Sequence, residues 1–204
     1  TPTDDIEVVA SEVFVYMVAG DFRVGVEDGS LAMLLNADNT FAMQASGVII
    51  LEGGIFNAVS ADLVTVKLNE TTTDYSLTPL TLTIDGISAD LTPGLDARSI
   101  SIVGLSADFD GAFALSGNFA FEKSGVTPNI EIIVVASEVA VSVTTGSFAV
   151  GVEDGTLALL INETGTKALT ATGAFFFVGE GFGSATADLV TANFNDTGIN
   201  FGAT

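Results

Sequence analysis

The chain has 204 residues, of which 48% are hydrophobic, and its formal net charge is -21. Because 26 acidic residues stand against 5 basic ones, the chain lacks the cationic surface that binds nucleic acid, and we expect no nucleic-acid partner. Cysteine, histidine and tryptophan are absent, which excludes disulfides, thiolate metal sites and any triad or zinc site built on histidine. No apolar run approaches the roughly 18 residues of a membrane-spanning helix, so we expect no transmembrane segment.

Apolar and polar residues alternate with period two along most of the chain, as expected for strands with two different faces. In chain order the clearest runs are 22–27, 80–85, 99–102 and 139–143. Turn sequences separate them, and Asp-Gly between alternating runs is a strong signal for a β-hairpin. These sequences are Asp28-Gly29, Asn36–Asn39, Gly53-Gly54, Asp85-Gly86, Pro93-Gly94, Asp110-Gly111 and Asp154-Gly155. No amphipathic helical pattern is present, so the sequence predicts an all-β protein.

The chain also repeats itself at a shift of 126 positions. Of the 78 residues from 1 to 78, 36 are identical to their partners at 127–204, without a gap. We therefore predict tandem antiparallel β repeat units, 1–126 and a partial copy at 127–204, built as a sandwich or meander. Residues 84–91 resemble residues 102–109, eighteen positions later, and this echo leaves an elongated β-solenoid as the alternative. The chain begins Thr1-Pro2 without an initiator methionine, which predicts a processed or excerpted chain.

Acidic residues beside turns are candidate ligands for Ca²⁺, which binds several oxygen atoms at close range. The candidates are Glu27, Asp28, Asp108, Asp110, Glu153 and Asp154. The alternative for each aspartate is that it caps a tight turn through hydrogen bonds to nearby backbone. Calcium is the one cofactor that the sequence suggests.

Two further patterns concern modification and catalysis. Asn69, Asn162 and Asn195 each precede a threonine by two positions, which makes them candidate glycosylation sites. Paired carboxylates for hydrolysis are hard to distinguish among so many acids, and nothing marks a substrate cleft. We therefore expect that the protein is not an enzyme.

Two uninterrupted apolar runs align with each other in the repeat, 48–51 and 175–178. Such runs indicate burial on both faces of a strand. An internal sandwich strand would explain them, and a polymer interface is the rival explanation. The residues that would mediate self-association are Val48, Ile49, Ile50, Leu51, Phe175, Phe176 and Phe177.

The blocks Phe148–Leu159 and Ala168–Gly173, together with the acidity and the scarcity of lysine, resemble the repeats of giant extracellular bacterial adhesins of the calcium-associated, RTX-like type. This resemblance implies a secreted rod-like protein that serves adhesion or matrix formation and is associated with calcium.

We accordingly expect an extracellular structural repeat protein at the cell surface, part of a fibre, filament or adhesin stalk, whose main partner is itself. Three alternatives stay open: a cell-surface module that binds a carbohydrate or protein ligand, an archaeal or halophile surface-layer or pilus subunit, and, least expected, a hydrolase.

Overall fold

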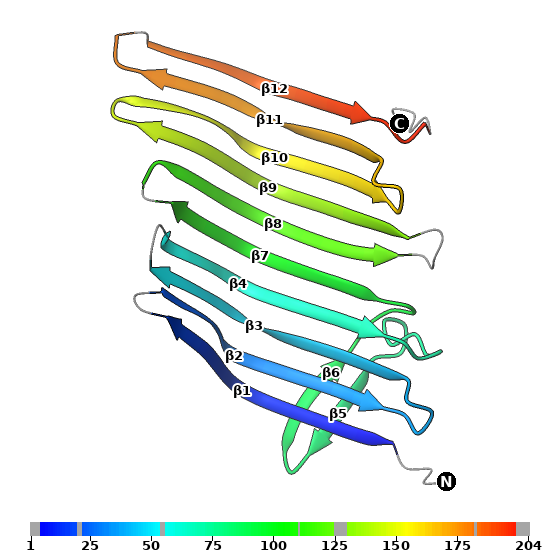
Figure 1. Ribbon diagram of the computed structural model, residues 1–204. Coiled ribbons are helices and arrows are strands. Elements are labelled where there is room, and N and C mark those ends of the chain that lie inside the picture. Colours follow the sequence, from blue (N-terminus) through cyan, green and yellow to red (C-terminus); the bar gives the residue numbers. More distant parts are fainter. Residues whose placement is uncertain are drawn as a thin grey trace.

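The computed structural model describes residues 5–19, 22–53, 56–109, 111–124, 130–181 and 183–198. Ten strands form one antiparallel meander in the order β1-β2-β3-β4-β7-β8-β9-β10-β11-β12, and β5 and β6 form a separate hairpin (Figure 1). The strands are β1 (Ile6–Ala19), β2 (Phe22–Leu35), β3 (Phe41–Gly53), β4 (Phe56–Asn69), β5 (Leu80–Ile84), β6 (Ile87–Leu91), β7 (Arg98–Phe109), β8 (Phe113–Ser124), β9 (Glu131–Thr145), β10 (Phe148–Asn162), β11 (Lys167–Gly179) and β12 (Gly183–Asn195). The prediction of an all-β antiparallel fold is confirmed.

The two repeat units lie side by side within the same sheet. Unit one contributes β1 to β4, β7 and β8, and unit two contributes β9 to β12. The seam is an ordinary antiparallel ladder between β8 and β9, with Phe113 opposite Val143 at one end and Ser124 opposite Glu131 at the other. Each repeat therefore advances the sheet by six strands, about 29 Å at the usual strand spacing.

The main sheet is a single layer over most of its area, as Figure 1 shows. Among the described residues it is covered by the β5–β6 hairpin, which packs across β1, β2 and β3, and by the connection from β4 to β5, which contributes Tyr75. The small buried core is formed there by Ala32, Leu34, Ala42, Tyr75, Leu82 and Leu91.

A row of β-bulges crosses the sheet near the middle of the strands, and it corrects part of the turn prediction. Asp28-Gly29 and Asp154-Gly155 were expected to form hairpin turns, but they lie inside β2 and β10. The register shifts beside them, between Glu27 and Ser30 and between Val152 and Gly155. Asp28 and Asp154 both have φ 51°, the left-handed conformation that such a bulge needs and that aspartate tolerates better than most residues.

Related features continue the row across neighbouring strands. Glu12 in β1 and Glu138 in β9 also have φ 54°, and Gly104 in β7 has φ 64°. In β3 and β11 the row passes through Gly47 and Gly173, which face the bulges of β2 and β10. Each bulge adds one residue to its strand and so changes which residues point to which face.

Other expected turns are found where they were predicted. Asn36–Asn39 joins β2 to β3, and Asp85-Gly86 joins β5 to β6. Pro93-Gly94 lies in the connection from β6 to β7. Gly54 and Asp110 lie outside the described residues.

The base of the hairpin is held by Asn69 at the end of β4, which is only 1% exposed. Its Nδ2 donates to the carbonyl oxygens of Thr73 and Gly94, both at 2.8 Å. Its Oδ1 accepts from Thr71 N at 3.0 Å and Thr71 Oγ1 at 2.8 Å. One side chain thereby fastens both connections of the hairpin to the sheet.

We predict that Asn69→Ala lowers the free energy of unfolding by about 2–4 kcal/mol, because several buried hydrogen bonds are lost and backbone carbonyls are left without a donor. Asn195→Ala is the matched control, since Asn195 is the repeat partner of Asn69 and is exposed, and it should cost less than about 1 kcal/mol. Urea denaturation measures both. Equal losses in the two variants would contradict the role assigned to Asn69.

Candidate functional site

One face of the main sheet is apolar from end to end. Residues directly opposite in neighbouring strands point to the same face, so the register assigns each side chain to a face. The face that β5–β6 does not touch is called the apolar face here. Its described side chains include Leu31, Met33, Ile49, Val64, Val66, Ile100, Ile102, Phe113, Leu115, Phe119, Phe121, Ile132, Val134, Val141, Val143, Val150, Val152, Leu157, Leu159, Leu169, Phe175, Phe177, Val190 and Phe194.

Acidic side chains are absent from the apolar face among the described strand residues outside the bulge row, although the chain carries 26 acids. Its charged residues are Arg98, Lys123 and Lys167, which stand at strand ends. Many of its large side chains are open to solvent, for example Val143 at 46% and Ile100 at 43%. An exposed apolar surface of this extent marks an interaction site.

The opposite face, called the polar face here, carries serine, threonine, asparagine and acidic side chains, together with exposed apolar ones such as Val103 and Val178. A polar chain runs along its bulge row over four strands, beginning where the Asp62 carboxylate lies over Gly104. The backbone N–H of Gly104 donates to Asn118 Oδ1 at 2.8 Å, and Asn118 Nδ2 donates to Glu138 Oε2 at 2.9 Å. These contacts join β4, β7, β8 and β9 at the level of the bulges.

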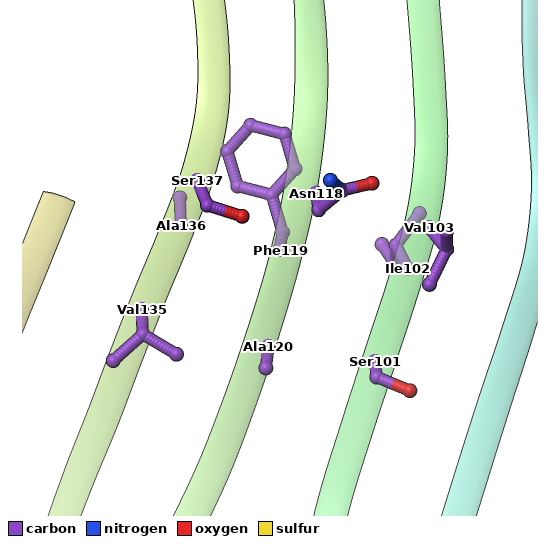
Figure 2. Close-up of a pocket in the computed structure, with 9 residues that line it drawn as sticks. All are labelled: Ser101, Ile102, Val103, Asn118, Phe119, Ala120, Val135, Ala136 and Ser137. Carbon is purple, nitrogen blue, oxygen red and sulfur yellow. The ribbon is translucent and has the colours of Figure 1, made fainter. Parts of the chain in front are cut away.

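A hollow of about 240 Å³ lies beside this polar chain. Figure 2 shows that its lining comes from three neighbouring strands, with Val135, Ala120 and Ser101 lying in one row across them. The hollow exists because small side chains stand between Val103 and Val135, and it is smaller than the usual 300–1,000 Å³ of a small-molecule site. It holds no cluster of titratable groups from which catalysis could be argued.

The candidate calcium ligands do not come together. Glu27 and Asp28 lie in β2, whereas Glu153 and Asp154 lie in β10, six strands away and about 29 Å apart by strand spacing. Asp108 Oδ1 accepts from Gly111 N at 2.8 Å, so Asp108 caps a turn, as the alternative to a calcium site predicted. Asp110 lies outside the described residues. The described residues contain no group of three or more potential metal ligands, and calcium binding stays a prediction.

The three candidate glycosylation sites share one local structure. In each, the asparagine Oδ1 accepts from the backbone and hydroxyl of the threonine two residues later, as at Asn162 and Thr164 (3.1 and 2.7 Å). Asn195 binds Thr197 in the same way and is exposed. Asn69 is buried with its amide nitrogen engaged, so a glycan could be added there only before the hairpin docks.

The residues predicted to mediate self-association divide between the two faces. Ile49, Phe175 and Phe177 lie on the apolar face, opposite Val26, Val152 and Val150. Val48 lies on the polar face, as does Phe176, whose ring lies over Gly151. The side chains of Ile50 and Leu51 lie outside the described residues. The runs therefore mark only a small part of the apolar face, most of which consists of single alternating residues.

The described residues contain no helix with the length and apolarity needed to cross a membrane. No protein-family model matches the chain, and neither a curated protein nor a solved structure matches it. The functional argument therefore rests on the two faces of the sheet.

We predict that Gly173→Ala lowers the free energy of unfolding by about 1–3 kcal/mol, because overpacking a close contact forces neighbouring atoms apart. A Cβ on Gly173 would lie 2.3 Å from Val152 Cγ1 and 3.2 Å from the Glu153 carbonyl oxygen. In a Val152→Ala background the same substitution should cost clearly less. A double-mutant cycle followed by urea denaturation measures the coupling, and strictly additive losses would contradict this contact.

Two turn aspartates have a lowered pKa. The Ser76 hydroxyl donates to Asp74 Oδ1 at 2.6 Å and lowers the pKa of Asp74. The Thr40 hydroxyl, also at 2.6 Å, does the same for the pKa of Asp38. A carboxyl whose folded pKa is depressed stabilises the fold above its unfolded pKa of about 3.9, and this contribution is lost as the pH falls through the folded value.

We predict that Ser76→Ala raises the pKa of Asp74 toward its ordinary value, since the first cause of the depression is removed. Carboxyl ¹³C NMR titration between about pH 2 and 6 measures it. The pKa of Asp38 is the internal control and should not move. An unchanged pKa of Asp74 would show that the hydroxyl is not the cause.

Proposed function

We propose that this chain is a non-enzymatic structural module of an extracellular fibre, filament or adhesin stalk. It works by self-association, in which the apolar face of one copy packs against the apolar face of a second copy. The observation that carries the proposal is a sheet face that is apolar between the strand ends and that nothing in the described chain covers.

Surface area supports a second copy as the cover. The chain exposes 12435 Å², whereas a compact protein of 20.8 kDa exposes about 8,900 Å². Ten strands of about 13 residues span a face of roughly 48 by 43 Å, or about 2,000 Å². Pairing two such faces removes about 4,000 Å² in total, within the range of obligate homodimer interfaces.

Charge supports the same arrangement. Face-to-face packing leaves the acidic side chains of both copies on the two outer surfaces, where water and salt screen them. No acidic side chain at a strand position paired in the ladders points into this interface. The packing therefore avoids the large cost of burying an unpaired charge. The result is a two-layer sandwich with an acidic coat.

The repeat supports growth into a fibre. Unit two continues the sheet of unit one through the β8–β9 ladder, so each further copy of the unit would extend the ribbon perpendicular to its strands. The outer edge of β12 is the repeat equivalent of the β4 edge that bonds to β7, and open edges of this kind accept further strands. The extracellular location and the adhesive role are supported by the acidity and by the resemblance to giant adhesin repeats.

The net charge of -21 also favours the surface-layer or pilus subunit of a halophile as a second candidate. Repulsion between acidic chains opposes both folding and assembly until salt screens it. The two candidates share the same interface and differ in the salt concentration at which it forms.

We predict that the chain is a dimer or larger at micromolar concentration and that Val143→Glu weakens association at least about 100-fold, because the introduced carboxylate is buried in the interface. Val178→Glu is the matched control: it has nearly the same exposure, 49% against 46%, but lies on the polar face, opposite Ala149, and it should leave association unchanged. Analytical ultracentrifugation at several NaCl concentrations measures both.

A monomeric wild-type chain at all salt concentrations, or equal weakening by the two variants, would contradict the proposal. Binding to neutral lipid vesicles by a chain that stays monomeric without them would contradict it as well, since the apolar face would then have a different occupant.

A further inference from the structure

The hairpin β5–β6 docks on a defined receptor on the polar face of unit one. Ala32, Leu34 and Ala42, from β2 and β3, are 1%, 8% and 0% exposed beneath it, and they form one cluster with Leu82 and Leu91 of the hairpin. Val9 of β1 packs at the border of this cluster.

The same receptor recurs in unit two. A shift of 126 takes Val9 to Val135, Ala32 to Ala158, Leu34 to Leu160 and Ala42 to Ala168, each with the same residue type. These residues occupy equivalent register positions. Ala158 of β10 lies opposite Val135 of β9, and Leu160 of β10 lies opposite Ala168 of β11. Here no described segment covers them: Ala158 is exposed, and Val135 is 47% exposed.

The turn that leads into the hairpin recurs as well. In unit one Glu70 N donates to Phe41 O at 2.8 Å, and in unit two Asp196 N donates to Lys167 O at 2.9 Å. Asn195 Oδ1 accepts from Thr197 N and Thr197 Oγ1 at 3.0 and 2.8 Å, as Asn69 does from Thr71. The chain leaving β12 therefore takes the same initial course as the chain that leaves β4 for β5.

We propose that the polar face of β9, β10 and β11 is a second hairpin receptor, formed by Val135, Ala158, Leu160 and Ala168. Its ligand is a hairpin of the β5–β6 type, which a further copy of the repeat would place there as β5–β6 is placed over unit one. The ligand is a short hairpin with two leucines that face the sheet, equivalent to Leu82 and Leu91.

The polar residues at the border of the receptor differ between the two units, so a hairpin docked on unit two would make different hydrogen bonds there. In unit one Thr92 Oγ1 donates to Gln44 Oε1 at 2.7 Å, and Lys67 Nζ donates to Thr92 Oγ1 at 3.0 Å. The equivalents of Gln44 and Lys67 are Thr170 and Asn193, which bond to each other at 2.7 Å. The second receptor thus keeps the apolar residues at its centre but lacks the side chains that bind Thr92 in unit one.

The proposal is tested by thiol accessibility, because the chain has no cysteine of its own. A second copy of residues 79–124 is appended after residue 204, which keeps the repeat shift of 126 positions. Ala158→Cys is introduced, and its rate of reaction with Ellman's reagent is compared with and without the extension. Docking of the hairpin should slow the reaction at least about tenfold, since the thiol then reacts only after local opening.

The control is the same extension in which the residues copied from Leu82 and Leu91 are aspartate, and it should leave the thiol as reactive as in the unextended chain. Ala32→Cys, beneath the existing hairpin, gives the rate of a covered thiol. A shorter extension of residues 79–97 repeats the comparison without added sheet strands, in case the longer chain does not fold. Equal rates with the intact and the aspartate extension would overturn the proposal.

This readout reports on the polar face and is independent of the proposed self-association, which uses the apolar face. Failure of one therefore leaves the other standing.

Discussion

A β-sheet in water must bury at least one of its faces, and the described part of this chain buries little of either. The hairpin covers a patch over three strands, and the apolar face has no cover within the described residues. Hydrophobic burial is the main favourable term in folding, and a single layer leaves much of it unrealised. The proposed second copy would supply the other layer of a two-layer architecture, and this requirement is what connects the fold to the proposed assembling function.

The bulge row is the device that keeps the two faces chemically distinct over strands of 12–15 residues. In β10 the apolar residues occupy even positions before the bulge, such as Val150, and odd positions after it, such as Leu157 and Leu159. The extra residue at Asp154 restores all of them to one face. The glycines opposite, Gly47 and Gly173, leave room for Val26 and Val152 to lie over them. Acids and glycines that read as turns are thus part of the mechanism that segregates charge from apolar surface.

Much of the fold follows from the sequence, because alternation with period two and an ungapped repeat both have direct structural meaning. The error at Asp28-Gly29 has a physical reason: hairpin turns and this kind of bulge both need a left-handed residue, and Asp-Gly supplies it in either setting. The change from even apolar positions at Val26 to odd ones at Leu31 was the available signal. A hairpin turn would have needed a break between two separate runs, whereas a bulge continues one strand with its phase shifted.

The candidate site was predictable only in part. The apolar runs at 48–51 and 175–178 drew attention to self-association, but residues such as Ile100 and Phe121 have the ordinary alternation of any half-buried strand. Periodicity shows that one face needs a cover and carries no information on which chain provides it. The recurrence of the hairpin receptor in unit two likewise needed the register, because four separated residues gain meaning only when they meet on one face.

Small-angle X-ray scattering tests the central claim most directly, because it reports molecular mass and particle thickness in the same experiment. The account predicts the mass of two chains or a multiple of two, and a thickness set by two sheets packed about 10 Å apart. A particle with the mass of one chain and the thickness of one sheet, stable in solution across salt concentrations, would contradict it.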